Sequence, residues 1–218
     1  VLRDTWTNIS LAITDEDVLL SEPEPEPKTR AEFLKYSREI TLDPNTANQY
    51  LFLSEGNTKV TLMKQRQSYP DHPDRFITRF QVLSKESLTG RCYWEVKWNG
   101  RGGGVDVAVA YKNISRVGHS NECGFGFNDK SQAVRCNVDK HAFFNNTQTS
   151  VSVRRTTTVG VYLDHRAGVL SFYYVSKTMT LLHRVQTTFT QPLHAGFCLW
   201  NIDDTAEFIK LNQSSCSV

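Results

Sequence analysis

Histidine and cysteine are the residues in this sequence best suited to acid–base catalysis, nucleophilic attack or metal binding. The six histidines include no H-x-x-x-H or H-E-x-x-H spacing, which would bring two imidazoles to one metal ion. Cys123, Cys136 and His141 come nearest to a ligand set, but the two cysteines are widely separated and no second pair accompanies them. The sequence therefore predicts no metal and no cofactor.

Other catalytic patterns are also missing from the sequence. There is no G-x-S-x-G nucleophile elbow. Asp71-His72 lies between two prolines, which is more typical of a solvent-facing turn than of a catalytic dyad. Gly102-Gly103-Gly104 lacks the lysine and the helix start that a phosphate-binding loop requires. We therefore predict no catalytic residues and no enzymatic activity.

Composition limits the classes of partner. Lys and Arg number 25 against 23 Asp and Glu, a net charge of +2, which argues against a nucleic-acid or membrane-surface module. The basic pair Arg154-Arg155 is too short to change this. No apolar run approaches the roughly 18 residues of a membrane span, so we expect membrane contact only through the full-length protein. The hydrophobic fraction of 39% indicates a folded core.

Five scattered cysteines form an odd set without a C-x-x-C pair, so we expect free thiols rather than a disulfide framework. We expect Cys92 and Cys198 to be buried within strands. The chain begins at Val1 rather than at Met, and we expect the numbering to start within a longer polypeptide.

Elements that would position any functional residue follow a clear order along the chain. Residues 1–20 read as the tail of a preceding domain or a lead-in, and residues 21–30 as a linker of alternating Pro and Glu, which should be extended. Thr29 is a plausible N-cap for a short helix over Arg30–Glu39. The globular domain is expected over residues 31–212, followed by a C-terminal tail over residues 213–218.

From Ile40 onward, short runs of period two alternate with turn residues, which is typical of a β-sandwich. The stretch Tyr93–Trp98 places Trp94, Val96 and Trp98 on one face and Tyr93, Glu95 and Lys97 on the other. Val105–Tyr111 alternates less cleanly, as a strand buried on both faces would. Residues 158–163 and 169–174 flank a hairpin loop in which Gly168 can adopt a positive φ.

Four of these segments resemble, in order, the signatures of the PRY-SPRY family. Leu42-Asp43-Pro44 with residues 51–57 is similar to the PRY half, and residues 88–96 (LTGRCYWEV) to the opening of SPRY. Residues 159–164 with 167–173, and residues 189–200, resemble two later signatures. The resemblance implies an all-β fold, a two-layer antiparallel β-sandwich of the concanavalin-like jelly-roll type, preceded by a short N-terminal helix.

The resemblance also implies a function, which is binding of a protein partner through loops at one end of the sandwich. The amino-acid sequences of residues 41–47, 69–76 and 127–131 are similar to those of fish versions of the domain. The acidic proline linker favours the C-terminal targeting or subunit-assembly domain of a stonefish-type pore-forming haemolytic toxin, secreted in venom. The partner would then be a homologous toxin subunit or a cell-surface protein.

Two alternatives stay open at this point. The domain is also similar to the substrate-recognition part of fish tripartite-motif ubiquitin ligases and innate-immune receptors, which would place it in the cytoplasm. A domain that engages membrane lipid directly is the third possibility, although the sequence offers neither an amphipathic helix nor a strong basic patch for it.

The resemblance implies a partner-binding surface built from three segments. These are Asp106 and its neighbours, which follow the turn at residues 102–104, the stretch 125–144, and residues 200–203. Large apolar groups such as Trp94, Trp98 and Phe172 are expected to fill the core instead. In antibody-binding relatives, aromatic residues in the segment that matches Gln132–Cys136 form a key pocket. This chain has Ala133 and Cys136 in that neighbourhood, so the resemblance does not by itself imply antibody binding. The candidate partner-binding residues are Asp106, Phe125, Phe127, Arg135, His141, Phe143, Trp200 and Asn201.

Overall fold

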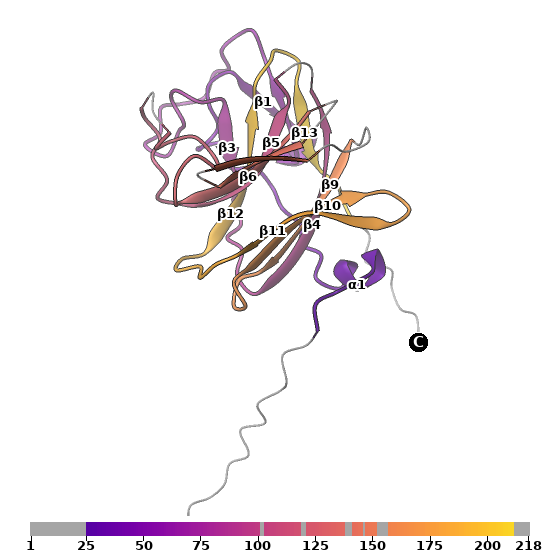
Figure 1. The fold of residues 1–218 in the computed structure, drawn as a ribbon. Coiled ribbons are helices and arrows are strands. Elements are labelled where there is room, and N and C mark those ends of the chain that lie inside the picture. The colour runs from indigo at the N-terminus through magenta and orange to yellow at the C-terminus, as the bar shows by residue number, and fades with distance from the viewer. Residues whose placement is uncertain are drawn as a thin grey trace, which may run out of the picture.

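A computed structural model describes residues 25–100, 103–118, 121–137, 141–145, 147–151 and 157–211. Most of the regular structure lies in two antiparallel sheets, which are packed face to face (Figure 1). In spatial order, the seven-stranded sheet contains β1 (Leu51–Ser54), β2 (Lys59–Leu62), β13 (Thr205–Phe208), β4 (Arg91–Asn99), β9 (Thr158–Asp164), β10 (Val169–Val175) and β11 (Met179–Gln186). The six-stranded sheet contains β3 (Gln81–Leu83), β12 (Leu193–Leu199), β5 (Val105–Tyr111), β6 (Ser131–Cys136), β7 (His141–Asn145) and β8 (Thr147–Val151). The predicted two-layer β-sandwich is confirmed.

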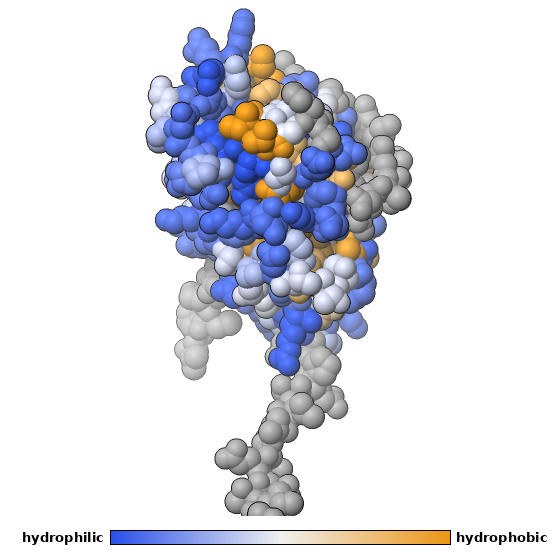
Figure 2. Space-filling model, turned by 90° about the vertical axis from the view of Figure 1, so that its left-hand side faces the viewer, coloured by the Kyte–Doolittle hydropathy of each residue, from blue (hydrophilic) through white to orange (hydrophobic). Residues whose placement is uncertain are grey.

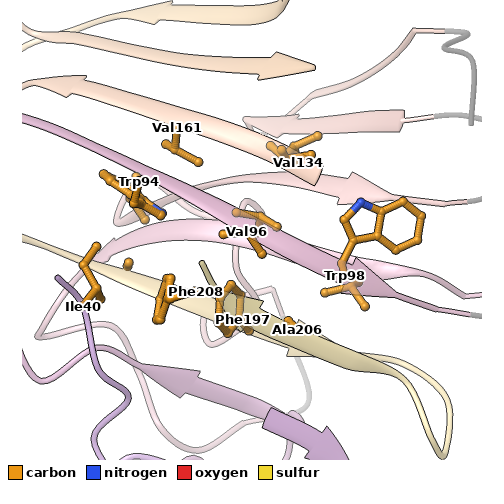
Figure 3. Close-up of a cluster of buried hydrophobic side chains, with 14 of the residues drawn as sticks. Ile40, Trp94, Val96, Trp98, Val134, Val161, Phe197, Ala206 and Phe208 are labelled. Atoms are coloured by element: carbon orange, nitrogen blue, oxygen red, sulfur yellow. The ribbon is translucent and has the colours of Figure 1, made fainter. Parts of the chain in front are cut away.

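The alternation within β4 explains how the two layers are joined. Trp94, Val96 and Trp98 point into the core between the sheets, where they pack with residues of β6, β9, β12 and β13 (Figure 3). Phe197 of β12 and Phe208 of β13 meet across this space with ring centroids 4.6 Å apart. Burial of these large side chains supplies the main driving force for closing the sandwich.

Tyrosines cover the outer face of the seven-stranded sheet, and a short helix packs on them. Phe33 of α1 (Arg30–Leu34) is 1% exposed and contacts Tyr93, Tyr162 and Tyr173 at centroid distances of 5.3, 5.2 and 4.9 Å. Beneath the helix, Glu95 is buried and accepts hydrogen bonds from Tyr93 and Arg30. The short N-terminal helix is therefore an integral layer of the domain.

The predicted helix begins where expected but ends five residues early. Thr29 caps it, and its side chain accepts a hydrogen bond from the backbone N–H of Glu32. The helix ends because the following residues pair with β4: the Arg38 N–H donates to the Tyr93 carbonyl, and the Tyr93 N–H donates to the Tyr36 carbonyl. Backbone hydrogen bonds to the N-terminal part of β4, which β13 does not pair with, thus replace the last helical turn.

The end of the predicted linker also contacts the sandwich. Pro27 is buried, and Glu26 is paired with Arg184 and accepts a hydrogen bond from Tyr173. These last linker residues are therefore held by the sheet rather than free of it. The predicted lead-in over residues 1–20 and the tail over residues 213–218 lie outside the described residues, and the boundaries at residues 30 and 212 stay predictions.

Two loops cover the outer face of the six-stranded sheet. Phe76, from the segment before β3, and Phe125, from the segment between β5 and β6, meet edge to face at 5.6 Å. They bury Ala108, Ala110 and their neighbours on the outer side of the sheet. Short alanines at these positions leave room for the two phenylalanine rings. The next outward-facing position of β5 toward its N-terminus is Asp106, beside this covered area.

Candidate partner-binding surface

A buried carboxylate organises the outer face of the six-stranded sheet where the loop cover ends. Asp106 is 1% exposed and binds Arg135 of β6 through two contacts, Nε to Oδ1 at 2.6 Å and Nη2 to Oδ2 at 3.0 Å. The indole Nε1 of Trp200 donates to the same carboxylate at 3.0 Å. The Arg135 guanidinium lies 3.9 Å from the centre of the Trp200 ring. Trp200 is therefore fixed by a hydrogen bond at its edge and a cation against its face.

Backbone geometry holds Trp200 from the other side. A Cβ atom at Gly103 would lie 2.7 Å from Cβ of Trp200 and 2.9 Å from Nδ2 of Asn201, so only glycine fits there. Gly104 has a φ of +81° and packs directly on the Cys136 carbonyl. The turn at Gly103 and Gly104, part of a segment that was expected to border the partner-binding surface, allows the loop after β12 to approach β5.

Asp204 fixes the turn that presents Trp200 and Asn201. Its buried carboxylate accepts hydrogen bonds from the Asn201 N–H at 2.8 Å and from the Trp200 N–H at 3.4 Å. Asp203 between them takes a left-handed φ of 72°. An aspartate that bonds backbone N–H groups of its own turn is a recognisable turn signal, and the -N-I-D-D- sequence contained it.

Arg79 and Phe127 complete a group of side chains that we call the Trp200 cluster. Its members are Arg79, Asp106, Phe127, Arg135, Trp200 and Asn201. The Arg79 guanidinium lies 5.8 Å from the Trp200 ring and 6.0 Å from the Phe127 ring. Arg79 lies just before β3, at the end that pairs with the C-terminal part of β12. Sequence reasoning missed it because a single arginine in an irregular segment belongs to no pattern.

The segment that carries Arg79 is anchored by buried polar contacts. Arg75 is 2% exposed, and its guanidinium donates to the carbonyls of Pro44, Ala47 and Pro70. Asn48 donates to the Ile77 carbonyl at 3.0 Å. This loop is consequently fixed to residues 44–48, although it contains no regular secondary structure.

An apolar border adjoins the cluster. Ile77 and Val117 are 59% and 62% exposed, and the Ile77 N–H donates to the Arg116 carbonyl, which brings the two segments side by side. Figure 2 views the molecule from the side that carries these loops in Figure 1 and shows hydrophobic residues gathered in the upper half of that face. Exposed apolar groups beside fixed polar ones are typical of a protein-binding surface.

Burial governs the ionisation of this surface. It raises the pKa of Asp106 above its ordinary value, and the hydrogen bonds and charge of Arg135 are the main effects that oppose the shift. Burial also raises the pKa of the Cys136 and Cys198 thiols, which disfavours reactive thiolates at neutral pH. Cys92 and Cys198 are buried within strands, as predicted.

The remaining predicted residues lie elsewhere. Phe125 is 1% exposed and packs on Phe76, so its side chain is part of the cover over the sheet and is not presented to a partner. His141 and Phe143 are in β7, opposite Cys136 and Val134, and their side chains lie outside the described part of the structure. Four of the eight predicted residues, Asp106, Arg135, Trp200 and Asn201, come together directly, and Phe127 joins them through Arg79.

Among the described residues, no group of three or more His, Cys, Asp or Glu side chains is arranged to hold a metal ion. No helix in the same ranges is long and apolar enough to span a membrane.

Comparison with known protein families identifies the family of this β-sandwich. The SPRY domain model matches residues 91–210, and the model of the SPRY-associated domain, PRY, matches residues 40–88. The chain belongs to the PRY-SPRY family. SPRY domains are protein-interaction modules, and the Trp200 cluster lies on one face of this one.

Individual relatives of this PRY-SPRY chain fall into two groups. It is 40% identical to neoverrucotoxin subunit alpha of Synanceia verrucosa, over 79% of the chain and 25% of the toxin subunit. It is 37% identical to tripartite motif-containing protein 16 of Mus musculus, over 87% of the chain and 34% of that protein. The chain thus spans a quarter to a third of the length of these relatives.

Two solved structures share the fold of this chain. The stonustoxin structure superposes with a TM-score of 0.74 at 35% identity, covering 84% of this chain and 29% of that one. The PSpry domain of TRIM65 superposes with a TM-score of 0.76 at 24% identity, covering 87% of this chain and 100% of that one. The latter likeness concerns the fold alone.

Proposed function

We propose that this PRY-SPRY domain is a non-enzymatic module that captures a protein partner on the Trp200 cluster. The observation that carries the proposal is the placement of Trp200, which is held by Asp106, Arg135 and the Gly103 contact while its ring stays half-buried. Tryptophan and arginine dominate the binding energy of protein interfaces, and a fixed anchor loses little entropy on binding.

Within that role, we favour the C-terminal targeting or subunit-assembly domain of a fish-venom pore-forming haemolytic toxin. Support comes from toxin subunits of two Synanceia species, which are 35–40% identical to this chain. The partner would be a homologous subunit or a cell-surface protein, and the parent protein would be secreted. Pore formation would require residues outside this chain.

The second candidate is the substrate-recognition domain of a tripartite-motif protein, which would act in the cytoplasm. The specific observation in its favour is that the match to tripartite motif-containing protein 16 extends over more of the chain than the toxin matches do. Both candidates use the same surface, so they differ in the partner rather than in the mode of binding.

A capture experiment tests the proposal. The 218-residue chain, its Trp200→Ala variant and a Leu181→Ala control would be immobilised and exposed to erythrocyte-membrane and cytosolic extracts. Leu181 is a suitable control because it is 49% exposed on β11, in the other sheet. We expect the wild type and Leu181→Ala to retain similar amounts of the partner. The amount retained by Trp200→Ala should be about tenfold or more lower, as for an interface hot spot.

The origin of the captured protein separates the two candidates. Retention from the membrane extract supports the toxin role, and retention only from cytosol supports the tripartite-motif role. Equal recovery on all three baits would contradict binding through the Trp200 cluster. Melting curves must show that both variants remain folded at the assay temperature, because Trp200→Ala also removes a hydrogen bond to the buried Asp106.

A further inference from the structure

Arg79 is the second cation of the Trp200 cluster, and its charge also lowers the pKa of the Asp106 carboxylate, which is bonded to Arg135. Arg135 is paired with Asp106 through two contacts, and the Asp204 carboxylate is buried and bonded to its own turn. Among the residues that the structure describes, Arg79 takes part in no ion pair. The cluster therefore presents one positive charge to an incoming partner.

The surroundings of Arg79 prepare its guanidinium for a ligand. The Arg79 guanidinium carbon lies 5.8 Å from the centre of the Trp200 ring and 6.0 Å from the centre of the Phe127 ring. Both distances are at the outer limit of a cation–π contact. A guanidinium that packs against rings keeps its N–H groups free at the edge of the plane, where they match the two oxygens of a carboxylate.

The backbone beneath Arg79 is also fixed before any partner binds. The Arg79 carbonyl accepts a hydrogen bond from the Gln81 N–H at 2.8 Å, and the Phe80 carbonyl accepts one from the Leu199 N–H at 3.1 Å. The exposed Ile77 side chain lies two residues away. The positive charge of Arg79 and the apolar side chain of Ile77 therefore belong to the same rigid segment. This arrangement favours a ligand that carries a negative charge beside an apolar group.

We infer that the Trp200 cluster recognises an acidic side chain, Asp or Glu, flanked by an apolar residue on the surface of the partner protein. Arg79 pairs with the carboxylate, while Trp200 and Ile77 contact the apolar neighbour. This inference rests on the proposed function, because it assigns the chemistry of the ligand at the same surface.

A selection from a phage-displayed library of random heptapeptides tests the inference. The baits would be the wild-type chain and its Arg79→Ala, Trp200→Ala and Arg166→Ala variants. Arg166 is the matched control, an exposed arginine in the turn between β9 and β10 of the other sheet. We expect Asp or Glu to be enriched at one position beside an apolar residue for the wild type and Arg166→Ala, and not for Arg79→Ala.

Titration of an enriched synthetic peptide makes the result quantitative. Replacing its acid by the corresponding amide should weaken binding to the wild type about tenfold, and should have little effect on binding to Arg79→Ala. This double-mutant cycle measures the interaction between Arg79 and the acidic residue of the peptide, separately from any general loss of stability in the variant.

The outcomes also distinguish the inference from the proposed function. Peptides without acid enrichment that still depend on Trp200 would overturn the acidic ligand and leave the binding surface intact. Peptides that bind Trp200→Ala as well as they bind the wild type would overturn both. A selection that enriches no sequence at all would count against the acidic ligand.

Discussion

At the scale of single residues, the Trp200 cluster is held together by one buried carboxylate, that of Asp106. Asp106 is buried on β5 and ionises against the cost of burial because Arg135 and the Trp200 indole supply three contacts to its oxygens. A buried ion is strongly destabilising once its partner is removed. The cluster is therefore a structural support as well as the proposed binding surface.

Arg135→Ala should reveal this dependence through pH. Without the guanidinium, the pKa of Asp106 in the folded state rises further above its unfolded value of about 3.9. The unfolded chain then loses the proton first as the pH rises, so the folded state binds more protons and becomes less stable. We expect a loss of about 3–5 kcal/mol at pH 8 and a smaller loss at pH 5.

Urea denaturation of the variant and the wild type at both pH values measures the difference. Asp106→Asn combined with Arg135→Ala removes the buried charge and should recover part of the stability at pH 8. A loss that is equal at the two pH values, or greater at pH 5, would show that Asp106 is not the group responsible.

At the scale of elements, a five-residue helix is stable only because of the sheet beneath it. Such a short segment does not form a helix alone in water. Phe33 enters a pocket of three tyrosines from β4, β9 and β10, and Arg30 pairs with Glu95 at 2.7 Å. Residues before the first strand thus belong energetically to the sandwich.

Phe33→Ala should therefore destabilise the whole domain and not the helix alone. Removing a buried phenylalanine from a closed site costs about 3–5 kcal/mol, because the lost contacts leave a cavity. Leu34→Ala is the matched control, since Leu34 is only partly buried. Chemical denaturation compares the two, and a loss for Phe33→Ala no greater than for Leu34→Ala would contradict the account.

At the scale of the whole molecule, the sequence predicted periodic features better than irregular ones. The alternation in Tyr93–Trp98 indicated the sandwich and the inward face of β4, since a strand places successive side chains on opposite faces. The burial of Phe125 was missed because its segment has no period and is folded over the sheet by contact with Phe76. Arg79 was missed for a related reason, since its neighbours in space, Trp200 and Phe127, come from the loop after β12 and from the segment before β6.

The contacts within the candidate surface depend on pairs of neighbouring strands. Asp106 and Arg135 are opposite each other in the register of β5 and β6, a pairing that no single segment of sequence specifies. Tertiary contact then adds Trp200 from the loop after β12. Family resemblance located the loops, and the structure assigned the contacts within them.

The most direct test of partner binding on the outer face of the six-stranded sheet is site-specific photo-crosslinking. Benzoylphenylalanine would be placed at Phe127, beside the Trp200 cluster, or at Leu181, which is exposed on the opposite sheet. Irradiation in the presence of a captured partner should give a covalent adduct from position 127 and none from position 181. An adduct from position 181 alone would place the partner on the other sheet and contradict the account.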